Sequence, residues 1–433
     1  MQHNVVFHLL ALMALSSTVS AADDWGDDSW GDEPESSIEL HGFIEAGMGG
    51  RIQTDPQLED DDLTLAELRG RLESERYVGD IRLSAKLDLY ADGVDDALQV
   101  NLREALADIS LGQNADLRIG QQVLTWGTGD LLFLNDLFAK DWQSFFSGRD
   151  DEYLKAPSAS LKLSYYGERA NLDVVWTPVF THDRFIEGER FSYFSPLVGQ
   201  QVAAPQYKLE PESPDENLKN GEFAARFYGS YDLWSGHNTE WAIYAYKGFW
   251  KQPNALNRYG RAYFSPMRSL GASLRTNIAD GIGYTELAWY EGEDDSGSDP
   301  FLPNDQLRFL LGYEQEVAPK LTLGLQYYRE QLMDYSELAA NDGDSPFRPD
   351  ETRELWTVRM TYSLLQDNLV LSWFSFYSPT DQDYYHRPSM KYRFDDEWSL
   401  TVGGNIFGGE QVHTFFGQFE EASNLYARLR WSY

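Results

Sequence analysis

The chain has 433 residues, no cysteine and a formal net charge of −35, because 70 Asp and Glu outnumber 35 Lys and Arg. This acidic balance excludes a nucleic-acid binder, which needs a basic face, and the lack of cysteine excludes a disulfide scaffold. Aromatic residues reach 15% while the mean hydropathy is only −0.49, a combination typical of a membrane barrel in which every second residue faces water.

The N-terminus predicts export. Residues 5–15 form a short apolar run, and small side chains follow at Val19 and Ala21, where a signal peptidase cleaves. The run is about half the ~20 residues that a transmembrane helix needs, so residues 1–21 are predicted to be a signal peptide cleaved near Ala21. Residues 22–37 repeat Trp-Gly-Asp and are otherwise acidic and polar, which predicts a flexible periplasmic leader.

From residue 38 onward, apolar and polar residues alternate. In residues 81–90, for example, Leu83, Ala85 and Leu87 alternate with Ser84 and Lys86. A period of two predicts strands and is incompatible with the 3.6-residue period of a helix. The pattern recurs in residues 38–48, 66–75, 159–165, 223–231, 307–313, 321–327, 356–362 and 398–406.

The connections alternate between short and long. Short turns are expected near residues 78–79, 112–114, 167–169, 234–237, 279–281, 318–320, 366–368 and 395–397. Long links are expected near residues 53–62, 92–97, 125–156, 179–220, 251–264, 292–304, 332–350, 379–386 and 409–422. This sorting predicts an all-β transmembrane antiparallel barrel over residues 38–433, with about 18 strands (16–18) and both termini periplasmic. A two-layer sandwich is the alternative, but it would not sort its loops by length.

The polar face of the predicted strands carries both signs of charge, and it is expected to line a lumen. The candidate lumen residues are Arg69, Arg71, Arg82, Lys86, Arg118, Lys162, Arg226, Arg275, Arg308, Arg359, Arg428, Arg430, Glu67, Glu73 and Asp88. Two interpretations stay open. The arginines either pair with carboxylates and stiffen the wall, or form a ladder that guides an anionic solute.

Residues 125–156 form an unusually apolar link. A loop of this composition is unfavourable in bulk water, so it is predicted to fold back into the barrel and narrow it, while residues 179–220 form a long extracellular loop. A loop packed on the barrel rim is the alternative. The candidate constriction residues are Trp126, Asp130, Phe133, Asp136, Trp142, Phe145, Phe146, Arg149, Asp150 and Asp151.

Three runs in residues 120–158 carry a resemblance: GQQVLTWGTGD, NDLF followed by KDW, and GRDDEYLKAPS. They resemble a block found in uncharacterised porin-like outer-membrane proteins of proteobacteria, distantly similar to a larger barrel family of unknown function. The chain departs from that block at Ala139, where the pattern favours proline. The resemblance implies a barrel and a link to hydrophobic or lipid-like cargo. The alginate-export porins are similar in predicted architecture only.

The last residues, 423–433, alternate again and end in Trp431 and Tyr433. A terminal aromatic residue is typical of outer-membrane barrels, and it predicts recognition by the barrel-assembly machinery through the last strand. Outer-membrane lipid and lipopolysaccharide are the other expected partners. The expected location is therefore the bacterial outer membrane.

Catalytic signals are weak. The motifs HExxH and GxSxG and a phosphate-binding loop are missing, and His41, His182, His237, His386 and His413 are scattered, His41 on the inward face and the others in connections or near strand ends. No enzyme, metal or cofactor is expected. The favoured function is a porin for passive passage of a small or medium solute. A conduit for lipid-like compounds with periplasmic partners and a structural or adhesive barrel are the alternatives, and the short length argues against an energy-coupled receptor.

Overall fold

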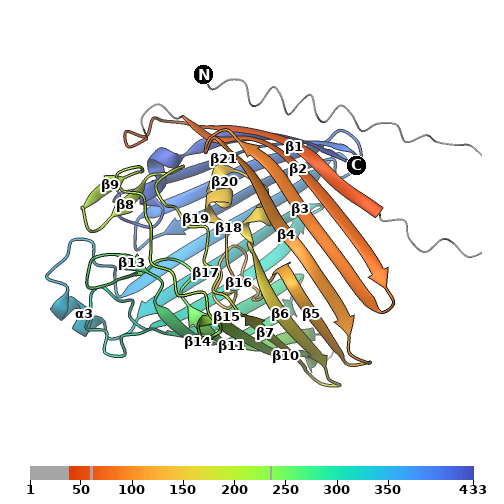
Figure 1. Ribbon diagram of the computed structural model, residues 1–433, viewed down its shortest axis with the longest axis horizontal. Helices are drawn as coiled ribbons and strands as arrows, with labels where there is room; N and C mark the ends of the chain where they lie inside the picture. The colour runs from red at the N-terminus through yellow and green to blue at the C-terminus, as the bar shows by residue number, and fades with distance from the viewer. Residues whose placement is uncertain (1–38, 59–61, 235–236) are drawn as a thin grey trace, which may run out of the picture.

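The computed structural model describes residues 39–58, 62–234 and 237–433. Within them, eighteen antiparallel strands form one closed sheet, which confirms the predicted all-β barrel (Figure 1). Its strands are β1 (Glu39–Arg51), β2 (Leu63–Val78), β3 (Ile81–Asp92), β4 (Ala97–Ser110), β5 (Ala115–Val123), β6 (Pro157–Tyr166), β7 (Asn171–Thr177), β10 (Glu222–Trp234), β11 (His237–Phe249), β14 (Pro266–Ile278), β15 (Gly281–Glu291), β16 (Gln306–Ala318), β17 (Leu321–Leu332), β18 (Thr352–Leu364), β19 (Leu369–Ser378), β20 (Asp383–Arg393), β21 (Trp398–Gly409) and β22 (Asn424–Ser432). The predicted signal peptide and leader, residues 1–37, lie outside the described residues.

The first and last strands close the barrel. β1 pairs with β22 from Phe43↔Ser432 to Arg51↔Asn424, and it pairs with β2 on its other side. Closure leaves no free sheet edge, which is what a spanning β-structure requires in lipid. No helix in the described part of the chain is long and apolar enough to cross a membrane.

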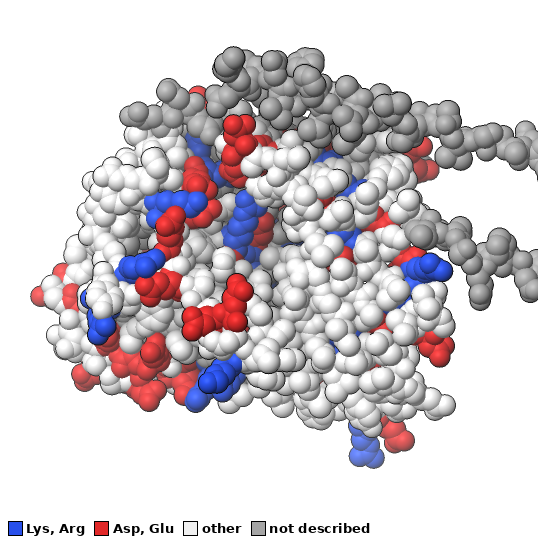
Figure 2. All heavy atoms as spheres, viewed as in Figure 1, with Lys and Arg blue, Asp and Glu red and all other residues white. Residues whose placement is uncertain are grey.

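Side chains alternate across the wall as the period-two pattern predicts. Leu98, Val100 and Leu270 point outward and are about two-thirds exposed, whereas Asp88 and Asp173 point inward and are almost fully buried. On the side of the molecule seen in Figure 2, charged side chains are dense over the long loops, at the left, and sparse over the strands. Apolar side chains therefore face out, and polar ones meet inside the barrel.

The two ends of the barrel differ. Short turns join the strands at one end, called here the short-turn end, and the links at the other, long-loop end carry the remaining elements. These are hairpins β8 (Tyr193–Ser195) with β9 (Gln200–Val202) and β12 (Ala255–Leu256) with β13 (Ala262–Tyr263), helices α2 (Trp142–Ser147) and α3 (Tyr335–Asn341), and 3₁₀ turns η2 (Asp151–Leu154), η3 (Leu218–Asn220) and η4 (Gly417–Ala422).

Two predicted long links are shorter than expected. Only residues 93–96 separate β3 from β4, and β20 begins at Asp383, so residues 383–386 belong to a strand. At the short-turn end, Tyr433 and Gly42 exchange backbone hydrogen bonds of 3.1 and 3.2 Å. Both ends of the barrel domain thus lie at the short-turn end.

Strand β5 pairs with β4 over a short ladder and ends at Val123, where the chain bends into the barrel. The β4–β5 ladder covers only Ala105–Ser110, whereas the β3–β4 ladder runs from Ala97 to Ile109. One residue before the end of the ladder with β4, Gly120 has φ +130°, and a Cβ there would lie 2.1 Å from the Ala105 carbonyl oxygen. Only glycine fits this backbone conformation and this close approach.

We predict that Gly120→Ala destabilises the barrel by roughly 2 to 4 kcal/mol, because the new methyl group meets backbone in a conformation that L-residues rarely adopt. Urea unfolding followed by tryptophan fluorescence in detergent measures the change. Gly70→Ala in β2 is the matched control, since a Cβ at Gly70 has no atom within 4 Å. Equal stability of the two variants would contradict this account of the bend.

Candidate functional site

Residues 124–156 lie inside the barrel, where they contact β15 and β18 on one side and β2 on the other, and we call them the inner loop. Many of its apolar side chains are buried, several of them against the wall. The Phe146 ring lies 5.0 Å from the Phe407 ring and 5.6 Å from the Tyr385 ring, and Trp126 packs edge-on to Phe138 at 4.9 Å. Helix α2 begins where the Asp141 side chain accepts a hydrogen bond from Ser144 N, and it ends at Gly148. The apolar composition is explained by this contact with the wall.

One anchor of the inner loop is Glu286, an almost fully buried carboxylate on β15. It accepts hydrogen bonds from Gly129 N at 2.7 Å, Thr128 Oγ1 at 2.9 Å and Asn135 Nδ2 at 2.7 Å, and it also accepts one from Thr128 N. Hydrogen bonds to a buried charged acceptor are among the stronger ones. Glu286 therefore fixes the turn at which the inner loop reaches the far wall.

The next residue of the inner loop is held by two neighbouring strands. Gln326 on β17 accepts from Asp130 N at 2.8 Å and donates to Asp130 O at 2.9 Å, and Arg359 on β18 forms a 3.0 Å ion pair with the Asp130 carboxylate. Burial raises the pKa of Asp130 above its ordinary value, Arg359 opposes this, and the nearby Glu314 and Asp151 reinforce it.

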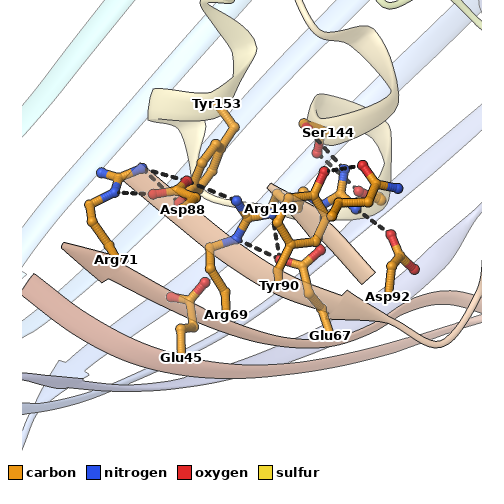
Figure 3. A network of polar contacts seen from close by, with 12 residues as sticks. Glu45, Glu67, Arg69, Arg71, Asp88, Tyr90, Asp92, Ser144, Arg149 and Tyr153 are labelled. Atoms are coloured by element: carbon orange, nitrogen blue, oxygen red, sulfur yellow. Dashed lines mark hydrogen bonds and ion pairs between the residues drawn. The ribbon is translucent and has the colours of Figure 1, made fainter. Parts of the chain in front are cut away.

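On the opposite wall, two arginines of β2 share one carboxylate (Figure 3). Asp88 on β3 accepts from Arg69 Nη1 at 2.9 Å and from Arg71 Nε at 2.6 Å, and all three side chains are buried. Arg71 also donates to Glu152 and to the Tyr153 hydroxyl, both at 2.8 Å, and these two residues belong to η2 of the inner loop. The wall network thus continues into the inner loop.

Arg149 carries the same network further along the inner loop. Its side chain is 3% exposed and forms ion pairs of 2.8 Å with Glu67 on β2 and 2.7 Å with Asp92 on β3 (Figure 3). Asp92 also accepts a 2.5 Å hydrogen bond from Arg190 Nη2, and Arg190 Nη1 donates to the Thr64 carbonyl oxygen. Because Arg190 lies in residues 178–221, that second long loop also reaches into the barrel.

The closing strands hold the segment after α2. Asp150 lies between Arg428 Nη1 at 3.1 Å and Arg430 Nη2 at 3.2 Å, and both arginines also pair with Glu45 on β1. Burial alone would raise the pKa of Asp150, but the two arginines outweigh it and lower the pKa to about 2. Arg387 on β20 forms a 2.7 Å ion pair with Asp151.

The candidate lumen residues mostly form ion pairs with carboxylates. Arg82 and Arg118 share Asp108, Lys162 and Arg226 share Asp173, Lys86 pairs with Glu73, and Arg308 pairs with Glu330. Arg275 is exposed and has no ion pair within the described chain. The arrangement matches the paired-wall interpretation more closely than an arginine ladder. Their part in solute selection stays a prediction.

The candidate constriction residues lie together in the inner loop, and two of them have partners in the loops. Asp136 pairs with Lys140 of the same loop at 2.9 Å and not with a wall charge, and Trp142 Nε1 donates to Asp183 of the second long loop at 2.8 Å. Phe133 lies under the Lys140 ammonium at 4.7 Å, and Phe145 lies under the Arg387 guanidinium at 3.8 Å.

Sequence reasoning missed several residues that hold the inner loop. Arg103 on β4 donates to the carbonyl oxygens of Glu152 and Lys155, and the Asn405 and Asn424 side chains both donate to the Phe146 carbonyl oxygen. The alternation indicates that Glu286, Gln326 and Arg387 point inward. It carries no signal for which inward residue the inner loop contacts.

Among the described residues, two sizeable cavities inside the barrel lie at different heights. One, of about 430 Å³, is lined by the inner loop and by the long-loop ends of strands β14 to β20. The other, of about 300 Å³, lies toward the short-turn end and is lined mainly by polar residues of β2 to β5, including Glu73, Arg82, Lys86, Glu104 and Arg118. We call them the outer and inner cavities.

His386 is placed differently from the sequence interpretation. It is the fourth residue of β20, and its Nδ1 lies 2.7 Å from Ser375 Oγ beside the outward-facing rings of Trp373 and Tyr384. A serine nucleophile needs a base that a third group orients. Among the contacts described for His386 there is no carboxylate, so this pair does not form a triad. No metal-ligand cluster is found among the described residues.

The comparisons bear on the fold. No family model matches this chain, and no curated protein is similar to it. Among solved structures, OccAB4 of Acinetobacter baumannii has a TM-score of 0.54 at 9% identity, covering 92% of this chain and 99% of its own. OpdQ of Pseudomonas aeruginosa has 0.51 at 12%, and the outer membrane protein opdK from the same species has 0.51 at 10%, each covering 92% of this chain and 98% of its own. The fold is that of a porin-type barrel.

We predict that Asp88→Asn destabilises the barrel by about 3 kcal/mol, because it leaves two buried guanidinium groups with too little negative charge. Asp344→Asn is the control, since that carboxylate is fully exposed beside Arg348 and is expected to change stability by less than about 0.5 kcal/mol. Thermal unfolding in detergent measures both. A change at Asp88 no larger than the change at Asp344 would show that the pairs carry no stability.

The shifts at Asp130 and Asp150 predict opposite effects of pH on stability. The folded pKa of Asp130 is raised, so its ionised form costs stability, and Asp130→Asn should be at least as stable as the parent protein at pH 7 and converge with it near pH 4. The folded pKa of Asp150 is lowered to about 2, so its contribution of about 2 kcal/mol is present at pH 7 and lost as pH falls from about 4 toward 2.

Unfolding midpoints of the parent and the two asparagine variants, measured from pH 7 to pH 2, check both signs. Asp150→Asn should be less stable than the parent at pH 7 and approach it only in strong acid. A loss of stability in Asp130→Asn at pH 7 would reverse the assignment for that end of the inner loop.

Proposed function

We propose that this protein is an outer-membrane channel for the passive passage of a small or medium solute, with the inner loop as its constriction. The observation that carries the proposal is a closed eighteen-stranded porin-type barrel whose interior holds charged side chains and two cavities. A barrel of this strand number is wider than its wall side chains can fill, so the interior can hold water and a loop.

The predicted signal peptide and the outward apolar surface support the outer membrane as its location. In the proposed orientation, the long-loop end is extracellular and the termini are periplasmic. Trp398, Trp431 and Tyr433 form an aromatic group at the short-turn end, with ring separations of 6.4 and 5.4 Å between neighbours. Such rings suit the membrane interface, and the terminal strand is where we place contact with the barrel-assembly machinery.

The charges of the constriction favour a structural task over anion selection. Asp130, Asp150 and Asp151 of the inner loop are each matched by wall arginines, and Arg149 of the inner loop is matched by wall carboxylates. Ion pairs of this kind fix the position of the inner loop and cancel much of its field. We therefore place solute selection in the size and lining of the cavities.

A conduit for hydrophobic compounds is the second candidate function. The apolar lining of the outer cavity favours this function, because leucine and phenylalanine side chains at an entrance cannot replace the water molecules around a strongly hydrated ion.

Planar-bilayer recording tests the channel. The purified protein should open in discrete steps, and Glu286→Ala should raise the conductance roughly two-fold, because it removes the acceptor that holds Thr128, Gly129 and Asn135. Glu337→Ala, on exposed helix α3, is the matched control and should leave the conductance unchanged. If neither the parent nor Glu286→Ala conducts, the protein is not a passive channel.

A further inference from the structure

We infer that the outer cavity is a binding site for an uncharged molecule with an apolar body, so that the channel accepts neutral hydrophobic solutes at its long-loop end. The inference rests on the proposed function and names its solute class. It is carried by the composition of the lining, by the pairing of every cation there, and by the contrast with the inner cavity.

The inner loop supplies the floor of the outer cavity. Leu131, Leu132, Phe133 and Leu137 turn toward it, and they are only partly buried. One side of these residues packs against the buried apolar cluster of the barrel, and each Å² of apolar surface that still faces water costs about 25 cal/mol. The inner loop thus presents an apolar surface to the outer cavity, and a hydrophobic solute would cover it.

The wall side of the outer cavity is also apolar and aromatic. Its lining residues come from seven strands, β14 to β20, and from the link before η4, and the apolar and aromatic ones include Met267, Tyr290, Tyr328, Leu355, Phe376, Tyr385, Phe415 and Phe416. Aromatic rings on one side and leucines on the other are the usual lining of sites for small apolar ligands. The volume of about 430 Å³ also falls within the range of such sites.

Each cation at the outer cavity has its own carboxylate. Lys140 pairs with Asp136 at 2.9 Å and Lys251 pairs with Glu222 at 2.7 Å. Arg308 and Arg353 pair in the same way.

Those two pairs lie on the wall. Arg308 contacts Glu330 at 3.2 Å, and Arg353 contacts Asp381 at 2.5 Å. The remaining carboxylate, Asp183, accepts from Lys140 N and Trp142 Nε1, both at 2.8 Å, and burial raises its pKa. An anionic solute would therefore find no free cation, and a cationic solute would find the Asp183 carboxylate already bound by these two donors, so the cost of removing either charge from water would not be recovered.

The inner cavity has a different character. Glu73, Glu104, Arg82, Lys86 and Arg118 line it, and several of them are partly exposed. The two ends of the passage thus offer different surfaces, a neutral apolar one at the entrance and a charged, wet one at the exit. This difference between the two ends favours a solute that binds at the outer cavity from the long-loop side and is released into water at the inner cavity.

Binding to the parent protein in nanodiscs tests the inference by calorimetry, with empty nanodiscs subtracted. Three probes share one ring system and differ in charge: 2-naphthol, 2-naphthoate and 2-naphthylmethylammonium. We expect 2-naphthol to bind at least about tenfold more tightly than either ion, because an unpaired buried charge costs more than about 1.4 kcal/mol. Equal or tighter binding of 2-naphthoate would overturn the inference.

Two variants locate the site. Leu132→Trp fills the outer cavity and should weaken 2-naphthol binding at least tenfold, whereas Leu311→Trp, on the outward face of β16, should not change it. Glu330→Gln frees Arg308 and should shift the preference at least tenfold toward 2-naphthoate, whereas Glu337→Gln should leave the preference unchanged. Unchanged 2-naphthol binding in Leu132→Trp would place the probe elsewhere and refute the site.

The outcomes separate this inference from the proposed channel. A protein that conducts ions but does not bind 2-naphthol keeps the channel and loses the neutral-solute site. A protein that binds 2-naphthol in the outer cavity but never conducts keeps the site and loses the channel.

Discussion

A guanidinium group inside a barrel must find a carboxylate, and most of the interior follows from that requirement. Arg69, Arg71 and Arg149 are almost fully buried, and each meets at least one acidic side chain. Removing such ions from water costs several kcal/mol apiece, so the pairs are tolerated only where geometry and extra hydrogen bonds are good. The carboxylates of β2 and β3 provide this, and the inner loop takes part in the same pairs.

The inner loop is consequently fixed to the wall of the barrel, although it lies in the lumen. It is held at Glu286 and Asp130 on one side and at Arg71, Arg149 and Asp150 on the other. Between these anchors its aromatic side chains pack on wall aromatics. Polar anchors fix where the loop sits, and apolar contacts pack the space between them. What is left is an apolar cavity on one side of the loop and a polar cavity on the other.

Sequence reasoning predicted the fold well because the barrel signal is periodic and repeated. The outward exposure of Leu98 and Leu270 and the inward burial of Asp88 follow from a period of two. The link at residues 93–96 was overestimated because a run of acidic residues extends beyond the turn into β3.

The inner loop was recognised by its composition alone, and its partners were not. Asp130 could be named, but its contact with Arg359 joins residues far apart in the sequence, and strand periodicity does not say which inward positions share a height. Asp136 was named as a constriction residue, but its local pair with Lys140, four residues on, was not predicted. Arg190 escaped notice because it lies in a long loop with no repeating pattern.

The early departure of β5 from β4 has a mechanical consequence. The ladder between them covers six residues of β4, while the β3–β4 ladder covers nearly the whole strand. The contact between β4 and β5, beside Gly120, therefore holds fewer backbone pairs than the contact between β3 and β4. Under force applied by an atomic-force cantilever, β4 should separate from β5 at a lower force than β3 separates from β4.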